Sequence, residues 1–168
     1  MAHLPVNHPA RPIYRVLATA VASYIFAFGI VGLVVSWGLP FFARGDIYAL
    51  GLRTNPAFSM LSIVVGAVVL GAEVYGRNLD HFINLWGSIV FLVAGVVMMT
   101  LLRTDLNLLN FAMRDCIVSF VIGVVLLAAG LYGKVGPPEF KDAEDRIRHG
   151  QLPHAGETPA EARSEFRS

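Results

Sequence analysis

Four long apolar runs dominate the pattern of hydrophobic and polar positions along the chain. Each run is close to the 20 or so apolar residues that a helix needs to cross a hydrocarbon core of about 30 Å. The sequence therefore predicts an all-α fold, an integral membrane four-helix bundle. The expected helices are Val16–Gly38, Pro56–Tyr75, His81–Leu102 and Cys116–Gly133.

Helix-breaking and helix-capping residues separate these runs. Pro40 follows the first run and cannot continue a helix. Asn55 is a good N-cap, and Pro56 suits the first helical position. The connection at 76–79 is so short that the second and third helices should be antiparallel neighbours.

The first run has an alternative interpretation as a cleaved signal peptide. The apolar core of such a peptide usually has about 7–15 residues, whereas no charged residue occurs between Arg15 and Arg44. We therefore expect the run to remain as a membrane span. Composition agrees, because the chain is 55% hydrophobic and 15% charged, against roughly 45–50% and about 25% in soluble domains.

The second and fourth runs contain similar stretches, residues 62–77 and 119–134. At a constant offset of 57 residues, eight of 16 aligned positions are identical and a basic residue closes both copies. We interpret the match as an internal repeat that makes two similar helical hairpins of one orientation, related by an axis along the membrane normal. Chance similarity between apolar helices is the alternative. Leu-Arg-Thr also recurs, at 52–54 and 102–104, which predicts about seven extra residues in the second hairpin loop.

Small residues spaced about four apart lie on one face of both repeated helices. In lipid, packing rather than the hydrophobic effect drives helix association, so small side chains favour close contact. We expect Gly29 and Gly32 of the first run and Gly95 of the third to receive these faces, although lining of a substrate path is an alternative. The predicted helix-packing residues are Ser62, Gly66, Ser119, Gly123 and Gly130.

Glu73 is the only acidic residue within a predicted span. Ionisable groups inside membranes often mark ion or proton pathways, so Glu73 and Arg77 form a candidate intramembrane polar site. The simpler interpretation, which the sequence favours, is that Glu73 lies about one turn from the helix end and pairs with Arg77 at i+4.

The remaining polar residues suggest little chemistry. His81 is the only histidine beside a span, so haem would lack a second axial ligand and we expect an interface residue. Cys116 is the single cysteine, which excludes an intramolecular disulfide. No hydrolase, metalloprotease or nucleotide-binding motif occurs in its required context. We therefore expect no catalytic residue, cofactor or metal, and favour a protein that is not an enzyme.

The loop between the third and fourth runs leaves two questions open. Asp105 and Asp115, with Arg103 and Arg114, could form an ion-pair cluster, but solvated loop charges are the favoured interpretation. The stretch 106–111 is amphipathic enough for a short helix on the membrane surface, and an ordinary, partly buried loop is equally consistent with it.

The distribution of positive charge predicts the orientation. Nine of the 13 Lys and Arg residues lie before the first run, in the connection between the second and third runs, or after the fourth run. Because cytoplasmic loops carry the excess of positive charge, both termini should be cytoplasmic. The expected division is a cytoplasmic N-terminal arm at 1–14, a transmembrane domain at 15–134 and a mostly disordered cytoplasmic tail at 135–168.

Three stretches carry a resemblance to a known family: Leu52–Phe58, Leu102–Asn107 and Ala129–Gly133. They resemble small four-span membrane proteins that are common in actinobacteria and catalogued as a domain of unknown function. The resemblance spans roughly residues 11–136 and implies a setting in a bacterial plasma membrane. It implies no activity and no catalytic residues.

These observations favour a non-enzymatic accessory or scaffold component. The alternative is a small oligomeric transporter or channel that uses Glu73, and a weaker hypothesis is a membrane enzyme acting on lipids. The expected partners are the lipid bilayer and either other membrane proteins or further copies of this chain. With a net charge of +1, the chain has no nucleic-acid footprint.

Overall fold

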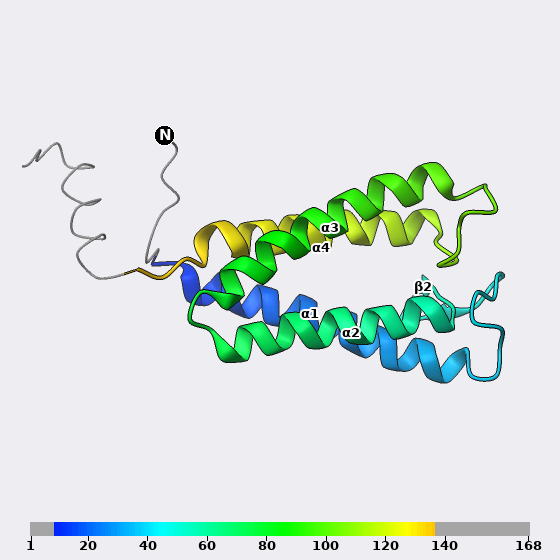
Figure 1. The fold of residues 1–168 in the computed structure, drawn as a ribbon, viewed down its shortest axis with the longest axis horizontal. Coiled ribbons are helices and arrows are strands. Elements are labelled where there is room, and N and C mark those ends of the chain that lie inside the picture. The colour runs from blue at the N-terminus through cyan, green and yellow to red at the C-terminus, as the bar shows by residue number, and fades with distance from the viewer. Residues whose placement is uncertain (1–8, 137–168) are drawn as a thin grey trace, which may run out of the picture. The chain divides into compact units, whose positions relative to one another are not determined.

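The computed structural model describes residues 9–136, and in that part of the chain four long α-helices form a bundle (Figure 1). Each helix is long and apolar enough to cross a membrane, so the prediction of an all-α membrane bundle is confirmed. The predicted tail beyond residue 136 and the first eight residues of the predicted arm lie outside the described residues. The helices are α1 (Arg11–Val35), α2 (Pro56–Tyr75), α3 (Leu79–Leu101) and α4 (Met113–Tyr132).

Local signals set the helix boundaries. Helix α2 has its predicted limits, and the Oδ1 atom of its N-cap Asn55 accepts a hydrogen bond of 2.8 Å from the Phe58 N–H. Helix α1 begins at Arg11 rather than near Val16, with a proline in its first turn. That position suits proline, because the first N–H groups of a helix have no partner within the helix. The earlier start places Arg11 and Arg15 on α1.

The helices pack mainly as two antiparallel pairs, α1 with α2 and α3 with α4, with fewer contacts between the pairs. In Figure 1 the pairs form two layers joined by the short α2–α3 turn, from which α2 and α3 diverge. We call this end of the bundle the turn end, and the opposite end, with the connections 36–55 and 102–112, the loop end. The main apolar core joins three helices through Ala18, Ala22, Ile25, Val69, Ile122, Leu126 and Ala129.

The two connections at the loop end differ in length and structure. Connection 36–55 is the longer and contains a short antiparallel ladder of β1 (Tyr48–Ala49) and β2 (Leu52–Arg53). The prediction of a longer second loop is therefore wrong. Its basis was the repeated Leu-Arg-Thr, but residues 52–54 lie just before α2 whereas residues 102–104 begin where α3 ends, so the two copies do not occupy equivalent positions.

Stretch 106–111 forms turns rather than a surface helix. Asparagine side chains hold it in place: Asn107 Nδ2 donates to the Phe111 carbonyl at 2.9 Å, and Asn110 Nδ2 donates to the Thr54 carbonyl at 2.9 Å. The first bond satisfies a backbone carbonyl within the stretch, and the second ties the stretch to the connection before α2. The loop interpretation of this stretch therefore holds.

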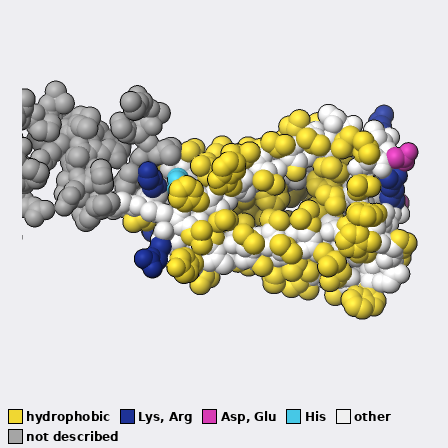
Figure 2. Space-filling model, in the orientation of Figure 1, with side chains coloured by type: hydrophobic (Ala, Val, Ile, Leu, Met, Phe, Trp, Pro, Cys, Tyr) yellow, Lys and Arg dark blue, Asp and Glu magenta, His cyan; other side chains and the backbone are white. Residues whose placement is uncertain are grey.

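The outer surface of the bundle is apolar along its length and charged at its ends. Figure 2 shows hydrophobic side chains over both layers, with Lys and Arg at the turn end and both basic and acidic side chains at the loop end. Large apolar side chains such as Val64, Val93 and Val121 are exposed. An apolar band between two charged ends is the surface that a lipid bilayer covers.

Candidate functional site

A buried polar cluster occupies the turn end, where all four helices converge. It consists of Arg11 and Arg15 of α1, Glu73 of α2, and Asp80 and Asn84 of α3; we call it the turn-end cluster. The two carboxylic acids and the amide are almost fully buried, with Glu73 2%, Asp80 1% and Asn84 2% exposed. Helix termini position every member, because each lies within about the first six or last three residues of its helix.

The two arginines of α1 reach the carboxylates of the neighbouring helices. Arg11 Nη2 lies 3.0 Å from Asp80 Oδ2, and Arg11 Nε donates a 2.9 Å hydrogen bond to the carbonyl of Gly133, directly after α4. Arg15 Nε lies 3.6 Å from Glu73 Oε2 and 3.9 Å from Asp80 Oδ2. The cluster thus links the ends of all four helices.

Two further hydrogen bonds orient Glu73. Arg15 Nη2 donates to the backbone carbonyl of Glu73 at 2.5 Å, and Asn84 Nδ2 donates to Glu73 Oε1 at 2.6 Å. The charges balance, since two guanidinium groups face two carboxyl groups. Burying a lone carboxylate costs several kcal/mol, and a paired, hydrogen-bonded one recovers much of that. The cluster can therefore act as an ionic clamp.

The turn-end cluster also retains acceptor atoms. Among the described residues, Glu73 Oε2, Asp80 Oδ1 and Asn84 Oδ1 are buried without a hydrogen-bond partner. All three oxygens can still accept a hydrogen bond, and the two carboxyl oxygens can also accept a proton. No group of three or more His, Cys, Asp or Glu side chains in the described part of the chain is arranged to hold a metal ion.

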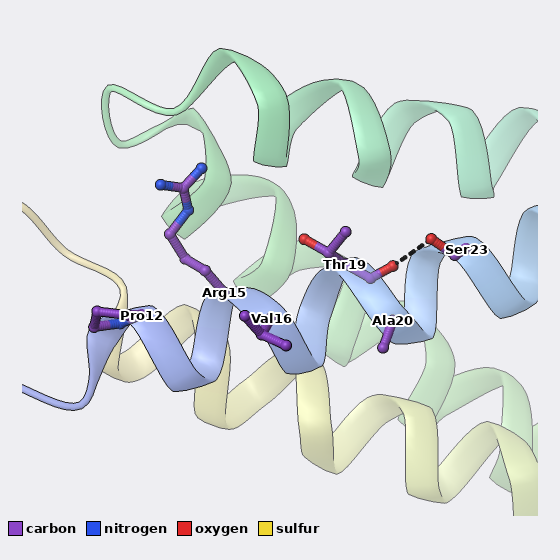
Figure 3. Close-up of a pocket in the computed structure, with 6 residues that line it drawn as sticks. All are labelled: Pro12, Arg15, Val16, Thr19, Ala20 and Ser23. Atoms are coloured by element: carbon purple, nitrogen blue, oxygen red, sulfur yellow. Dashed lines mark hydrogen bonds between the residues drawn. The ribbon is translucent and has the colours of Figure 1, made fainter.

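A shallow depression of about 560 Å³ runs along α1 beside the cluster (Figure 3). Arg15 and Thr19 point from α1 toward the neighbouring helices in Figure 3, and Ser23 Oγ donates to the Thr19 carbonyl at 2.7 Å. The side chain of Arg15 is 41% exposed, so the cluster is accessible from this side. The depression is lined by Pro12, Arg15, Val16, Thr19, Ala20 and Ser23.

The structure does not pair Glu73 with Arg77, contrary to the sequence-based expectation. Helix α2 ends at Tyr75, and Arg77 lies in the α2–α3 turn with a φ of 53°. Arg77 is exposed and makes no ion pair with another residue of the described range. The i+4 argument fails because it requires the helix to continue through residue 77.

Sequence reasoning missed Arg15, Asp80 and Asn84 because they come from other helices. Their positions in the sequence could have indicated them. Arg15 and Asp80 are charged residues directly beside predicted spans, at the same end of the bundle as Glu73. His81 was assigned to the interface, yet it is buried, and its Nδ1 lies 2.5 Å from the Gly130 carbonyl.

The predicted helix-packing residues lie in interhelical contacts. A Cβ atom on Gly66 would lie 2.7 Å from the backbone nitrogen of Phe26, and one on Gly123 would lie 2.7 Å from Leu92 Cγ. A Cβ on Gly130 would lie 2.9 Å from the Leu85 nitrogen. Separations below 3.0 Å are essentially never seen for real Cβ atoms, so each position requires glycine or a shift of its neighbour.

The two predicted serines are also buried, and two further glycines lie in close contacts between helices. Ser62 and Ser119 are both 5% exposed, and Ser62 Oγ donates to the Phe58 carbonyl at 2.8 Å. A Cβ on Gly29 of α1 would lie 2.6 Å from the Ile63 nitrogen, and one on Gly95 of α3 would lie 3.0 Å from Phe120 Cε1. Close approach is therefore a property of both helix pairs.

The loop end has its own polar contacts, which differ from those expected. Arg44 Nη1 lies 2.9 Å from Asp105 Oδ1 and joins the two connections. Asp115 is buried rather than solvated, and its Oδ2 accepts a 2.6 Å hydrogen bond from the Ala112 N–H at the start of α4. The alternative of a cluster of Asp105 and Asp115 with Arg103 and Arg114 is therefore not formed. The favoured interpretation, solvated loop charges, agrees with the exposed Asp105 and is wrong for Asp115.

Another ion pair at the loop end lies within the first connection. Arg53 Nη2 bonds Asp46 Oδ1, and its guanidinium carbon lies 6.0 Å from the centre of the Tyr48 ring. The hydrogen bond from Arg53 and its positive charge lower the pKa of the exposed Asp46 carboxyl. The same contact raises the pKa of Arg53.

Comparison with known proteins adds a family but no activity. No curated protein and no solved structure matches the chain. One family model, described as a domain of unknown function (DUF4383), matches residues 15–132, which contain nearly all of the four helices and of the turn-end cluster. The chain therefore belongs to the DUF4383 family, and it is a membrane protein of that family.

Proposed function

We propose that the protein is a non-enzymatic accessory or scaffold component of a bacterial plasma membrane, with both termini cytoplasmic. The observation that carries this proposal is the charge balance of the turn-end cluster. Glu73, the one acidic residue within the predicted spans, is held by Arg15 and Asn84. A carboxylate engaged in this way stabilises the arrangement of the helices, while the outer helix faces remain free to meet lipid or partner proteins.

The exposed apolar faces supply the surface for such partners. Helix association in membranes relies on packing between complementary faces, and each described helix has exposed apolar side chains. Other membrane proteins, or further copies of this chain, are the partners of suitable chemistry. The predicted cytoplasmic tail would add a second contact outside the membrane.

An internal duplication accounts for the two similar helix pairs and belongs to this proposal. The contact Phe26–Gly66 corresponds to Leu92–Gly123, and Gly29–Ile63 corresponds to Gly95–Phe120. In both correspondences the α1 and α3 residues differ by 66 and the α2 and α4 residues by 57. If the two sequences were similar only by chance, there would be no reason for the contacting residues of both helices to keep constant offsets. The constant offsets therefore support a duplication.

Copurification from membranes tests the scaffold proposal. We expect the wild type and Glu73→Gln to recover the same membrane partner in mild detergent. Substitution of an exposed apolar residue, Val64→Trp, Val93→Trp or Val121→Trp, should remove that partner in at least one case. Loss of the partner with a folded Glu73→Gln variant, or retention in all three face variants, would contradict the proposal. Reporter fusions at both chain ends test the orientation.

The unpartnered oxygens of the turn-end cluster favour a second candidate, a small oligomeric transporter or channel. Glu73 Oε2 and Asp80 Oδ1 are buried acceptors, and Arg15 opens onto the depression along α1. Proton or cation flux into proteoliposomes, compared between the wild type and Glu73→Gln, decides this case. Flux that Glu73→Gln abolishes would support transport; equal flux in both would eliminate a path through Glu73.

A further inference from the structure

A second pocket, of about 480 Å³, lies at the loop end and has no part in the proposed function. Arg53 of β2 contributes one wall, and the end of α3 with the start of α4 contributes the rest, including Arg103. The two halves of the chain therefore build this pocket together. Its position at the end of the helices places it where the apolar band meets the headgroup region.

The pocket has a surplus of positive charge. Arg103 is exposed and makes no ion pair with any residue in the range 9–136. Arg53 Nε is buried without a hydrogen-bond partner in that range. Asp105, the nearest acidic residue to Arg103 in the chain, is paired with Arg44. The Arg103 guanidinium is thus available to an anion, and Arg53, which lines the same pocket, adds a second positive charge.

Two carboxylates near Arg53, those of Asp46 and Asp115, compete with an anion for its positive charge. Asp46 bonds Arg53 Nη2 but is itself exposed, and solvent and salt screen an exposed ion pair so that it holds Arg53 only weakly. Asp115 also interacts with Arg53, but one of its oxygens caps the Ala112 N–H. Neither carboxylate is among the lining residues, and Arg103 has no comparable competitor.

Apart from Thr100, the remaining lining residues are apolar, and two of them are exposed on the outer surface of the bundle. Met99 and Met113 line the pocket and are exposed, and Leu102 and the buried Phe111 complete its apolar side. A small inorganic anion would make no contact with these apolar side chains. A ligand with a negatively charged head and an apolar chain matches both the arginines and the methionines.

We propose that this pocket binds the phosphate headgroup of an anionic phospholipid from the leaflet at the loop end. The phosphate lies between Arg53 and Arg103, because guanidinium groups donate paired hydrogen bonds that fit phosphate oxygens. The acyl chains run past Met99 and Met113 into the surrounding bilayer. The occupant bridges the two helix pairs at the end where they diverge.

Native mass spectrometry of the full chain, released from nanodiscs of phosphatidylglycerol and phosphatidylcholine, tests this site. We expect phosphatidylglycerol to remain bound to the wild type and phosphatidylcholine to be lost. Arg103→Gln should lower the apparent affinity for phosphatidylglycerol about tenfold, the usual effect of removing one charged hydrogen-bonding partner. The matched control is Arg114→Gln, since Arg114 is exposed at the same end but does not line the pocket; its affinity should stay within about twofold.

Three results would overturn the proposal: equal retention of both lipids, equal loss of binding in Arg103→Gln and Arg114→Gln, or displacement of the lipid by inorganic phosphate alone. The last result would indicate a site for a free anion. Arg53→Gln gives a second test with the same expected loss. Because Arg53 also pairs with Asp46, this variant is compared only when its thermal melting matches the wild type, and Arg103→Gln decides by itself.

Discussion

The helix pairs α1–α2 and α3–α4 share a contact pattern but differ in chemistry. In the first pair, Arg15 Nη2 lies 2.5 Å from the carbonyl of Glu73; in the second, His81 Nδ1 lies 2.5 Å from the carbonyl of Gly130. These four residues keep the offsets of 66 and 57 that relate the glycine contacts. The comparison shows that small residues set how the helices cross in both pairs. Of the two corresponding positions 73 and 130, only position 73 carries an acidic side chain.

The two corresponding positions 73 and 130 also differ in the space that they leave for a side chain. A side chain at Gly130 would meet the backbone of Leu85, which leaves no room for a carboxylate there. At position 73 a full glutamate side chain fits and is buried. The second pair is therefore tightly packed at position 130, and the acidic residue that Arg15 contacts along its own helix pair is found only in the first pair.

The largest expected effect comes from breaking that clamp on one side. Arg15→Gln leaves the Glu73 carboxylate buried without its cation, which should destabilise the fold by about 2 to 4 kcal/mol, allowing for the partial exposure of Arg15. The double variant Arg15→Gln/Glu73→Gln should recover most of the loss, because no unpaired charge remains. Thermal melting in mild detergent measures both.

His81→Gln provides the matched change in the second pair. It removes or weakens the hydrogen bond between the His81 side chain and the Gly130 carbonyl, which costs about 1 kcal/mol. A loss for His81→Gln as large as that for Arg15→Gln would show that charge is not what distinguishes the two pairs.

A smaller effect should separate the glycine contacts of the two pairs. Gly66→Ala places a methyl group against the backbone of Phe26, which cannot move independently of its helix, whereas Gly123→Ala meets mainly the flexible side chain of Leu92. We expect a loss of about 2–3 kcal/mol for Gly66→Ala and about 1 kcal/mol for Gly123→Ala. Melting temperatures in the same detergent compare the two variants.

Gly71→Ala is the control in the same helix as Gly66. No atom lies within 4 Å of a Cβ added at Gly71, and alanine favours a helix over glycine by roughly 0.5–1 kcal/mol. This variant should therefore melt at or above the wild-type temperature. Equal losses for Gly66→Ala and Gly71→Ala would exclude close helix approach as the cause.

The smallest effect concerns the ion pair Asp46–Arg53, which only the connection of the first pair contains. Because Arg53 lowers the pKa of Asp46, the pair stabilises the fold above the ordinary pKa of 3.8, and this contribution is lost as the pH falls through the lowered value. Melting between pH 3 and pH 7 should thus decrease slightly more for the wild type than for Asp46→Asn. Identical pH profiles would show that this exposed pair contributes nothing measurable.

The four spans and the limits of α2 could be predicted from the amino-acid sequence alone, and its spacing of small residues includes glycines that lie at helix contacts. These features follow from local rules, since hydropathy, capping and a spacing of about four residues act within one helix. The same local rules placed Glu73 near a helix end, and that position is correct.

The partners of the polar residues, by contrast, depend on the packing of the helices in three dimensions. Glu73 was expected to pair with Arg77 four residues away, but its hydrogen-bond donors are Arg15 and Asn84, and Asp80 bonds Arg11 across 69 positions of the chain. Asp115 was expected in solvent and is buried beneath a loop. Such contacts depend on which helix ends meet, which is set by how the helices cross, and a pattern along one helix does not contain that information.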